Sequence, residues 1–491
     1  MRRSTDLKIE KTAHSRVFKH ELHRPIDHSH YEVRKMKSIK ERRAEAKAYR
    51  KTTTRSALGK WEVQSKRPVV EQLLLEQEKT RLKELIPIRR ERMAVSPFTF
   101  FRGSAIIQAH DLGISPGTCF RVQACGDAHI SNFGIFASPE RRLVFDINDF
   151  DETLPAPFEV DVKRLLASIE ICGRQRNFSK EERAQAVYDA AAFYRQTMRE
   201  FSEMGNLEVW YKHLDIEDVM NDDKYVDVDQ MKQIRDSIRK SLTKTSEKAV
   251  RKLTETVDGK IRIKSDPPLI VPFRDLVGEE KELYEFRYSM RKALDLYKET
   301  LPAERRRIID QYEPLEMAHK VVGVGSVGRQ AWILIMMGRE NGDPLVLQIK
   351  EAEASVLEAY YGASIYEKCG QRVVEGQRAI QTAGDILLGW VRLDDPRGIR
   401  KDYYVRQLWD AKGSFDMETI TPDMYHGLSL ASAWSLAHAH AKTGDRHAIA
   451  AYLGKGDVFD NSMVSYASAY ADQNEADYEV FLRMNSTGDT V

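Results

Sequence analysis

The segment CGDAHISNFG, residues 125–134, concentrates polar side chains that could do chemistry between two hydrophobic stretches. It places Asp127, His129 and Asn132 close together between two glycines. An aspartate can accept or orient a proton, and an asparagine amide oxygen is a hard ligand of the kind that Mg²⁺ binds. A solvated polar loop is the alternative interpretation. The choice depends on whether the rest of the chain supplies partners for a metal and phosphate site.

The segment DINDFDE, which follows closely, supplies further carboxylates: Asp146, Asp149 and Asp151. Protein sites for Mg²⁺ often use only one or two carboxylates, and phosphate oxygens and water complete the coordination. We favour Asp149, the first residue of DFD, as the metal ligand, and Asp146 is the second choice. The spacing from Asn132 fits Asp146 slightly better, so the choice stays open.

A second motif lies nearly 200 residues further on. Gly323, Gly325 and Gly328, with Ser326 among them, form the pattern G-x-G-x-x-G. Two unrelated nucleotide-binding folds share this pattern, so its context decides. In a dinucleotide-binding unit the glycines open a helix, whereas here they precede RQAWILIMM, which is rich in strand formers. The loop is therefore predicted to lie inside a β-hairpin, as in protein kinases, where glycines let the backbone fold over phosphates.

The strand LVLQIKEA places Lys350 where a kinase lysine contacts the α- and β-phosphates of ATP. That lysine needs a glutamate from the neighbouring helix, and we choose Glu375 in QRVVEGQR. Alternatives for the glutamate are Glu358 and Glu367. The later segment YYVRQLWD is predicted to be a strand whose backbone near Gln407 and Trp409 meets the adenine.

The same interpretation assigns the first segment. A kinase catalytic loop carries an Asp followed five residues later by an Asn, which is the spacing of Asp127 and Asn132. Asp127 would then accept or orient the proton of the substrate hydroxyl, and Asn132 would bind Mg²⁺. His129 would orient Asp127 or contact phosphate, with a structural role as the alternative. Arg102, in FFRGS, is a further candidate for a phosphate contact.

The segments GDAHISN and DFDE resemble the catalytic loop of aminoglycoside and choline kinases, HGDLHxxN followed by DFxD. From about residue 55 to 485 the chain is similar to a bacterial family called domain of unknown function 2252. The similarity rests on SPFTFFRGSA, CGDAHISNFGIFASPERRLVFDINDFDET, GVGSVG, LVLQIKEA and AHAHAKTGD, among other stretches. Membership implies little about substrate. The kinase resemblance also implies that Asp161, in FEVDVKRL, braces the catalytic loop.

The order of the motifs differs from that of ordinary kinases, because the catalytic loop precedes the glycine loop. We therefore expect an α+β, kinase-like fold of two lobes that is circularly permuted, with a small antiparallel β lobe and a mostly helical lobe. The expected units are a basic leader over 1–60, a helical lobe with the catalytic loop over 61–315, the β lobe over 316–412, and helices that complete the helical lobe over 413–491.

Composition limits the class of protein. Residues 1–60 carry 18 Lys and Arg against 7 Asp and Glu, in a chain whose net charge is only +2. This basic leader could contact a polyanion such as RNA, although a solvated leader is the simpler interpretation. No apolar run is long enough to span a bilayer. The four cysteines are too few to stabilise so long a chain, which favours a cytoplasmic protein.

Two classes of function follow from the sequence. The first is an ATP- and Mg²⁺-dependent phosphotransferase that acts on a hydroxyl of an unidentified acceptor, or a variant that transfers AMP. The second is a nucleotide-binding regulatory module, or an RNA-associated protein, with little turnover. Metal-dependent hydrolysis at the carboxylates ranks third, because it leaves the glycine loop without a role.

Overall fold

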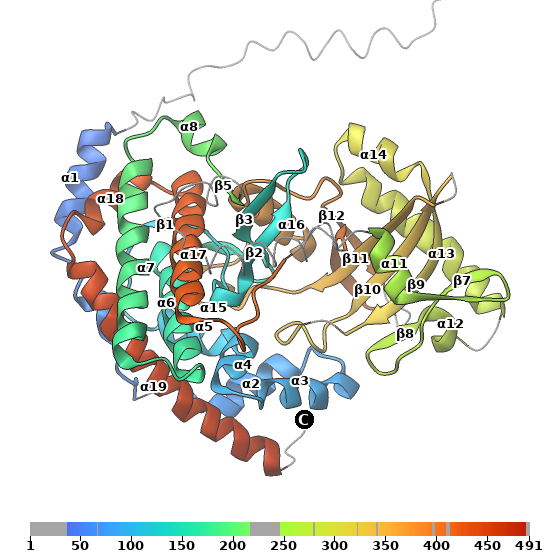
Figure 1. Cartoon of the computed structure of the whole chain (residues 1–491), viewed down its shortest axis with the longest axis horizontal. Coiled ribbons are helices and arrows are strands. Elements are labelled where there is room, and N and C mark those ends of the chain that lie inside the picture. Colours follow the sequence, from blue (N-terminus) through green and yellow to red (C-terminus); the bar gives the residue numbers. More distant parts are fainter. Residues whose placement is uncertain are drawn as a thin grey trace, which may run out of the picture.

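The structure, a computed structural model, joins a mostly helical part and a β-rich part (Figure 1). It describes residues 37–65, 67–216, 246–277, 280–321, 323–339, 342–394, 398–408 and 413–487. Helices contribute more residues than strands, and all of the paired strands are antiparallel. The predicted mixture of helices and antiparallel sheet is confirmed at this level.

A six-stranded antiparallel sheet forms the centre of the β-rich part, in the order β12-β13-β11-β10-β9-β8. Its strands are β8 (Ile270–Pro272), β9 (Tyr312–Lys320), β10 (Ala331–Gly338), β11 (Pro344–Ala352), β12 (Gly389–Asp394) and β13 (Arg400–Gln407). The glycine motif joins β9 to β10, so its predicted place inside a hairpin is confirmed. Lys350 lies near the end of β11, as predicted.

The two faces of this sheet pack against different helices, because successive side chains of a strand point to opposite faces. On one face, Leu345 and Leu347 pack with Tyr297 of α13 (Glu280–Glu299). On the other, Val346 packs with Val250 of α11 (Ser246–Leu253), and Lys350 shares this second face. The other elements here are β6 (Thr254–Val257), β7 (Lys260–Ile263), α12 (Phe273–Leu276), α14 (Ala303–Ile309), α15 (Glu358–Tyr361) and α16 (Cys369–Ile380).

The helical part is built around α6 (Phe158–Gln175), which is buried along almost its whole length. Around it pack α7 (Lys180–Phe201), α17 (Pro422–Thr443) and the long α19 (Val458–Thr487) (Figure 1). Small residues of the LASAWSLAHAHA stretch are buried on α17, which lets this helix lie close to α7. Remaining helices here are α2 (Val70–Glu78), α3 (Ile86–Met93), α4 (Pro97–Gly103), α5 (Ala105–Gly113), α8 (Asn206–Tyr211) and α18 (Arg446–Leu453).

Short strands within the helical part position residues 125–132, which we name the catalytic segment after its resemblance to a kinase catalytic loop. Strand β1 (Arg121–Ala124) pairs with β4 (Leu154–Pro157), and β2 (Phe133–Ala137) pairs with β3 (Leu143–Ile147), which also pairs with β5 (Leu214–Asp215). The stretch 125–132 therefore leaves one strand and enters another. The segment at 96–105 forms α4 and the start of α5.

The basic N-terminal segment is part of the fold from residue 37 onward. Helix α1 (Ile39–Tyr49) packs on α18 at one end of the helical part (Figure 1). Arg50 donates to the Tyr452 carbonyl at 2.8 Å, and Arg55 donates to the Leu453 carbonyl at 2.7 Å. Cations that bind the last carbonyls of a helix are favourable there. The predicted boundary at residue 60 therefore divides a folded region, while residues 1–36 lie outside the described residues.

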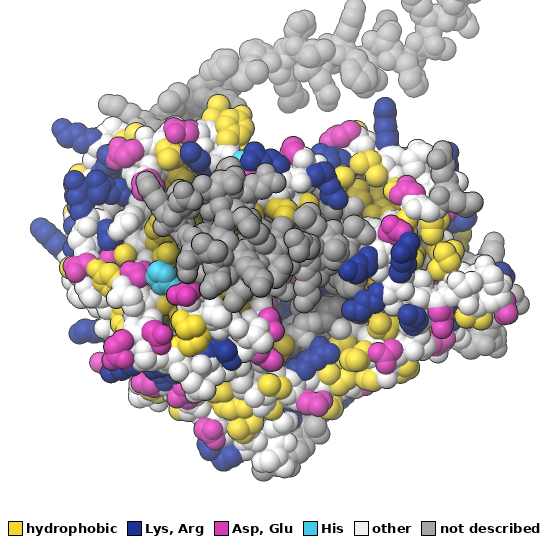
Figure 2. All heavy atoms as spheres, viewed as in Figure 1, with side chains coloured by type: hydrophobic (Ala, Val, Ile, Leu, Met, Phe, Trp, Pro, Cys, Tyr) yellow, Lys and Arg dark blue, Asp and Glu magenta, His cyan; other side chains and the backbone are white. Residues whose placement is uncertain are grey.

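The visible surface mixes charges of both signs. Figure 2 shows dark-blue Lys and Arg side chains gathered over α1, with Asp and Glu side chains between them and across the rest of this face. Among the described residues, no helix is both long enough and apolar enough to cross a membrane.

Leu58 tests whether residues 37–60 are structural. It is fully buried next to α19. We expect Leu58→Ala to lower the stability of the helical part by about 2–5 kcal/mol, because it leaves a cavity. Ile39→Ala on exposed α1 is the control, with an expected loss below about 0.5 kcal/mol. Denaturant unfolding followed by tryptophan fluorescence measures both, and equal stabilities would mean that this segment is a solvated leader.

Candidate active site

Asp161 of α6 holds the backbone of the catalytic segment in place. Its carboxylate accepts the N–H of Cys125 at 2.7 Å and that of Gly126 at 2.9 Å. A Cβ at Gly126 would collide with the Glu152 carbonyl, and its positive φ of 83° also favours glycine. The brace implied for Asp161 is confirmed. A buried carboxylate with two backbone donors fixes the turn that carries Asp127.

Asp127 faces a pocket and is anchored from α6. Arg164, one turn after Asp161 on the same helix, donates through Nε to the Asp127 carboxylate at 2.8 Å. Burial raises the pKa of Asp127 to about 6, although Arg164 opposes the shift and the carboxylates of Asp149 and Glu152 add to it. A carboxyl group that titrates near neutral pH is suited to accept a proton.

Asn132 and His129 flank the same pocket. The Asn132 side-chain amide donates to the Asp127 carbonyl at 2.7 Å, which leaves its oxygen available as a ligand atom. His129 Nε2 lies 3.9 Å from the Asp127 carboxylate, and its buried Nδ1 has no hydrogen-bond partner. Burial, with Arg102 and Arg164 nearby, lowers the pKa of His129 well below its ordinary value, so the ring is neutral. A neutral imidazole is able to donate or accept one hydrogen bond here.

The three aspartates of DINDFDE have different surroundings. Asp149 lines the pocket, and its carboxylate accepts the nearby Asp151 N–H at 3.2 Å. Asp146 points elsewhere: it is buried and accepts from the Thr382 N–H at 2.8 Å and from the Thr382 hydroxyl at 2.7 Å. Asp146 therefore positions the loop after α16, and it is not grouped with Asn132, contrary to the second choice for a metal ligand.

Asp151 is the partner of Lys350, and the ion pair joins the two parts of the molecule. Lys350 Nζ lies 2.9 Å from the Asp151 carboxylate, which also accepts the Tyr404 hydroxyl at 2.6 Å and the Ser326 hydroxyl at 3.2 Å. Burial alone would lower the pKa of Lys350, but the Asp151 charge raises it above its ordinary value. Burial likewise opposes ionisation of Asp151, yet Lys350 and Arg329 hold its pKa below the usual range.

The predicted glutamate partner is therefore wrong. Glu375 on α16 pairs with Arg378 at 3.2 Å. Neither alternative pairs with Lys350: Glu358 lies 3.8 Å from Arg372, and Glu367 lies 2.6 Å from Arg392.

The glycine loop closes over the pocket and is held from the helical part. Arg92 donates to the Gly323 carbonyl at 2.6 Å, and the Leu82 N–H donates to the Gly328 carbonyl at 2.8 Å. Gly328 has a φ of 92°, and a Cβ there would lie 2.9 Å from the Arg81 Cβ. A side chain at this position would push the loop away from Arg81.

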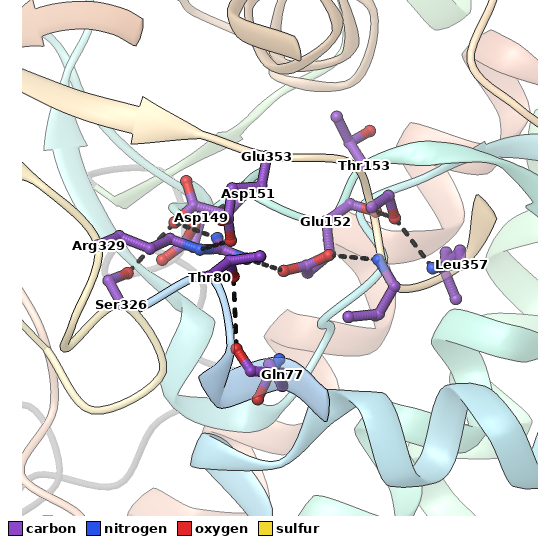
Figure 3. Close-up of polar contacts among 12 residues, drawn as sticks. Gln77, Thr80, Asp149, Asp151, Glu152, Thr153, Ser326, Arg329, Glu353 and Leu357 are labelled. Carbon is purple, nitrogen blue, oxygen red and sulfur yellow. Dashed lines mark hydrogen bonds and ion pairs between the residues drawn. The ribbon is translucent and has the colours of Figure 1, made fainter. Parts of the chain in front are cut away.

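Together these elements enclose a polar pocket of about 100 Å³. It is lined by Gln77, Arg81, Arg102, Gly103, Ala105, Asp127, His129, Asn132, Asp149, Asp151, Glu152, Gly323, Val324, Gly325, Ser326 and Arg329. Figure 3 shows Ser326 and Arg329 reaching toward Asp149 and Asp151. Arg102 makes no hydrogen bond or ion pair with any described residue, and its buried Nε has no partner. An unpaired guanidinium in a pocket is a ready contact for an anion.

Several members of the site were not predicted from the sequence. Arg329 directly follows the glycine motif and bonds Glu152 at 3.2 Å and Glu353 at 3.0 Å. Its position next to the glycine motif was a signal in the sequence that could have identified Arg329. Arg164 also had a signal, since it lies on the same face of α6 as Asp161. Glu152, Tyr404 and Arg81 had none, because their roles depend on contacts between distant segments.

The predicted adenine contact at Gln407 is not part of this pocket. The Gln407 backbone N–H, at the end of β13, donates to the Asp385 carboxylate. Trp409 lies outside the described residues.

A metal ion would have few protein ligands here. Within the described ranges no group of three or more His, Cys, Asp and Glu side chains is arranged to hold one. Asn132 and Asp149 are hard oxygen donors on one side of the pocket and fit Mg²⁺, which often takes only one or two protein ligands.

Comparison with known proteins identifies the family. A family model described as an uncharacterised protein conserved in bacteria, DUF2252, matches residues 81–484. The chain belongs to this family. The matched span includes the catalytic segment, the glycine loop and Lys350 of this DUF2252 protein. Neither the curated proteins nor the solved structures contain a match.

Asp161→Asn tests the brace. We expect faster amide exchange at Cys125 and Gly126 and a stability loss of about 1–3 kcal/mol, because one backbone donor loses its acceptor while buried. Hydrogen-exchange mass spectrometry measures the first effect and denaturant unfolding the second. Asp472→Asn, an exposed carboxylate on α19, is the control. Unchanged exchange over 125–132 in Asp161→Asn would contradict the brace.

Proposed function

We propose that this protein is an ATP- and Mg²⁺-dependent phosphotransferase. One observation carries the proposal: a single pocket brings Asp127, Asn132 and Asp149 of the helical part against the glycine loop and the Lys350 ion pair of the sheet. These segments are almost 200 residues apart in sequence. Catalysis of phosphoryl transfer is mostly positioning and charge stabilisation, and the pocket offers groups for both.

Cations and backbone groups would bind the phosphates. Arg102 is unpaired and faces the pocket, and Gly323 and Gly325 bring main chain close to it. Lys350 and the Ser326 hydroxyl are engaged by Asp151, so their contacts would be exchanged for phosphate oxygens when a ligand binds. Such an exchange keeps each buried cation paired with an anion, which avoids the penalty of an uncompensated charge.

Asp127 would accept or orient the proton of the acceptor hydroxyl. Its raised pKa keeps proton transfer possible near neutral pH, and Arg164 fixes the direction of its carboxylate. Asn132 and Asp149 would hold Mg²⁺, which neutralises phosphate charge when bound. Neutral His129 lies beside Asp127, and its buried Nδ1 has no hydrogen-bond partner in the described structure.

The described state has room for a phosphate group and a metal ion. The base of a nucleotide would lie further along the Lys350 face of the sheet, where Ile333 and Val346 form an apolar patch. Helix α11 covers this patch through Val250 and Leu253. Nucleotide binding on this proposal therefore requires the glycine loop and α11 to move.

The proposed architecture is a kinase-like fold of two lobes with a circular permutation. The hairpin β9–β10 with the glycine loop, β11 with its lysine, α16, and then β12 and β13 follow one another in the order of a kinase small lobe. The catalytic segment precedes them in the chain and meets them in space. Permutation preserves a site because only the chain ends change.

Two finer expectations accompany the proposal. An ATP-dependent enzyme of a bacterial family would work in the cytoplasm, where its nucleotide is kept. Arg50 and Arg55 bind carbonyls of α18, so a polyanion such as RNA would contact other cations of the N-terminal segment.

The acceptor and the transferred group can be identified with labelled ATP. Incubation of a cell extract with ATP labelled in the γ- or the α-phosphate would identify the acceptor and separate phosphoryl transfer from AMP transfer.

Lys350→Met and Arg102→Met test the phosphate site. We expect each to weaken Mg-ATP binding at least about tenfold, because a charge-assisted contact to phosphate is lost. Calorimetric titration measures the affinity. Arg102 has no partner to leave unpaired, so its variant should fold normally even if Lys350→Met is destabilised. Lys368→Met, an exposed lysine on the same part, is the control, and wild-type affinity in both test variants would refute the proposal.

Asp127 gives the proposal its pH dependence. Since burial raises its pKa to about 6, the carboxylate is protonated below that pH and available as a base above it. Turnover should therefore rise between about pH 5 and 7 and then level off. Asp127→Asn should lower turnover about 10²–10⁴-fold while ATP affinity changes little, as measured by labelled transfer and by calorimetry. Retained turnover in Asp127→Asn would exclude a role as base.

A further inference from the structure

A second cavity, of about 410 Å³, lies on a different side of α6 from the catalytic segment. Its mouth is the exposed loop over 115–119, and it shares no lining residue with the polar pocket. Asp161 and Arg164 of α6 face the catalytic segment, whereas Glu159 and Lys163 of the same helix line this cavity.

Lys163 is a buried cation that forms no hydrogen bond and no close ion pair with the described residues. Only 3% of it is exposed, and its Nζ lies 4.5 Å from the centroid of the Tyr466 ring. Glu159 is close enough to favour the charged amine, but its own oxygens accept from the N–H and the hydroxyl of Thr118. Burial lowers the pKa of Lys163 to about 8, so most of the amine is protonated at neutral pH.

The charge balance of the cavity indicates what it can hold. Lys163 and Arg121 are cations, and Glu159 is the single acid in the lining, so the site carries one net positive charge. Arg121 is fixed by donating to the Pro155 and Tyr361 carbonyls. Arg121 is exposed to solvent, whereas the buried Lys163 amine lacks a hydrogen-bond acceptor that an anionic group could supply. A monoanion fits this balance, whereas a phosphate dianion would leave excess negative charge.

The rest of the lining is apolar and aromatic. Leu112, Pro157 and Val160 contribute aliphatic surface, and Tyr360 and Tyr361 contribute rings. The Tyr360 hydroxyl is held by His110 Nδ1 at 2.8 Å, which orients its ring. An apolar cavity with a few convergent polar groups is typical of a site for a small organic ligand.

We propose that this cavity binds a small monocarboxylate with an apolar or aromatic body, whose carboxylate pairs with Lys163. The body of the ligand lies against Tyr360 and Tyr361, and the loop over 115–119 admits it. The site is separate from the polar pocket, and the inference does not depend on the phosphotransferase proposal.

The experiment uses the full chain and a defined set of probes: benzoate, phenylacetate and hexanoate, each beside its uncharged amide, together with inorganic phosphate. Saturation-transfer NMR detects binding, and calorimetric titration gives the affinity. We expect at least one carboxylate to bind with Kd below ~1 mM and its amide to bind at least about tenfold more weakly. Lys163→Met should weaken the carboxylate by the same factor, while Lys180→Met on exposed α7 should not.

Lys163→Met keeps the length of the side chain, and its thermal unfolding temperature shows whether the variant folds. A second readout needs no variant: the bound carboxylate should slow amine labelling of Lys163, measured by peptide mass spectrometry. The proposal is overturned if no carboxylate of the set binds, or if one binds equally well to Lys163→Met. Tighter Lys163-dependent binding of inorganic phosphate would overturn the assignment to monocarboxylates.

Discussion

The buried ion pair between Lys350 and Asp151 links the two parts of the molecule at the point where the polar pocket forms. Lys350 comes from the sheet and Asp151 from the loop between β3 and β4 of the helical part, and Tyr404 and Ser326 complete the contact. Two buried charges are held stably only when each satisfies the other and further hydrogen bonds assist. Loss of one partner leaves a buried charge and costs about 3–5 kcal/mol, so this pair fixes how the sheet and the β3–β4 loop meet.

The same physics explains why the pocket is rich in arginine. Glu152 and Glu353 are paired by Arg329, and Asp127 is paired by Arg164. Asp127, Glu152 and Glu353 therefore each have a guanidinium beside them. Arg102 differs, since it forms no ion pair with a described residue and the Asp127 charge acts on it only at longer range. On the proposed function the missing anion is a phosphate group, which makes the unpaired arginine part of the site's chemistry.

Features that depend on residues close together in the sequence were predictable, and contacts between distant segments were not. The hairpin around the glycine loop and Lys350 at a strand end were predicted correctly, because local spacing and strand periodicity carry them. The brace from Asp161 was implied by the resemblance to small-molecule kinases. The partner of Lys350 was not. Glu375 was chosen because helix α16 precedes the next strand, yet the aspartate that reaches Lys350 lies 199 positions away in sequence. The folded state of residues 37–60 was missed for a similar reason, since their charge composition resembles a solvated leader, while their partners are carbonyls on α18.

Helix α6 contributes residues both to the support of the catalytic segment and to the second cavity. Asp161 and Arg164 fix the catalytic segment from one side of the helix, and Lys163 projects into the second cavity from another. A packed helix moves as a rigid element, because its neighbours leave little free volume around it. A ligand that pairs with Lys163 therefore acts on the same rigid element that holds Asp127. The glycine loop is held by hydrogen bonds from Arg92, Leu82 and Arg81, by the Ser326–Asp151 contact and by the burial of Val327 against Leu85. Each hydrogen bond contributes only about 1 kcal/mol net, so on the proposed function a bound ligand has to replace these contacts while α6 keeps Asp127 in position.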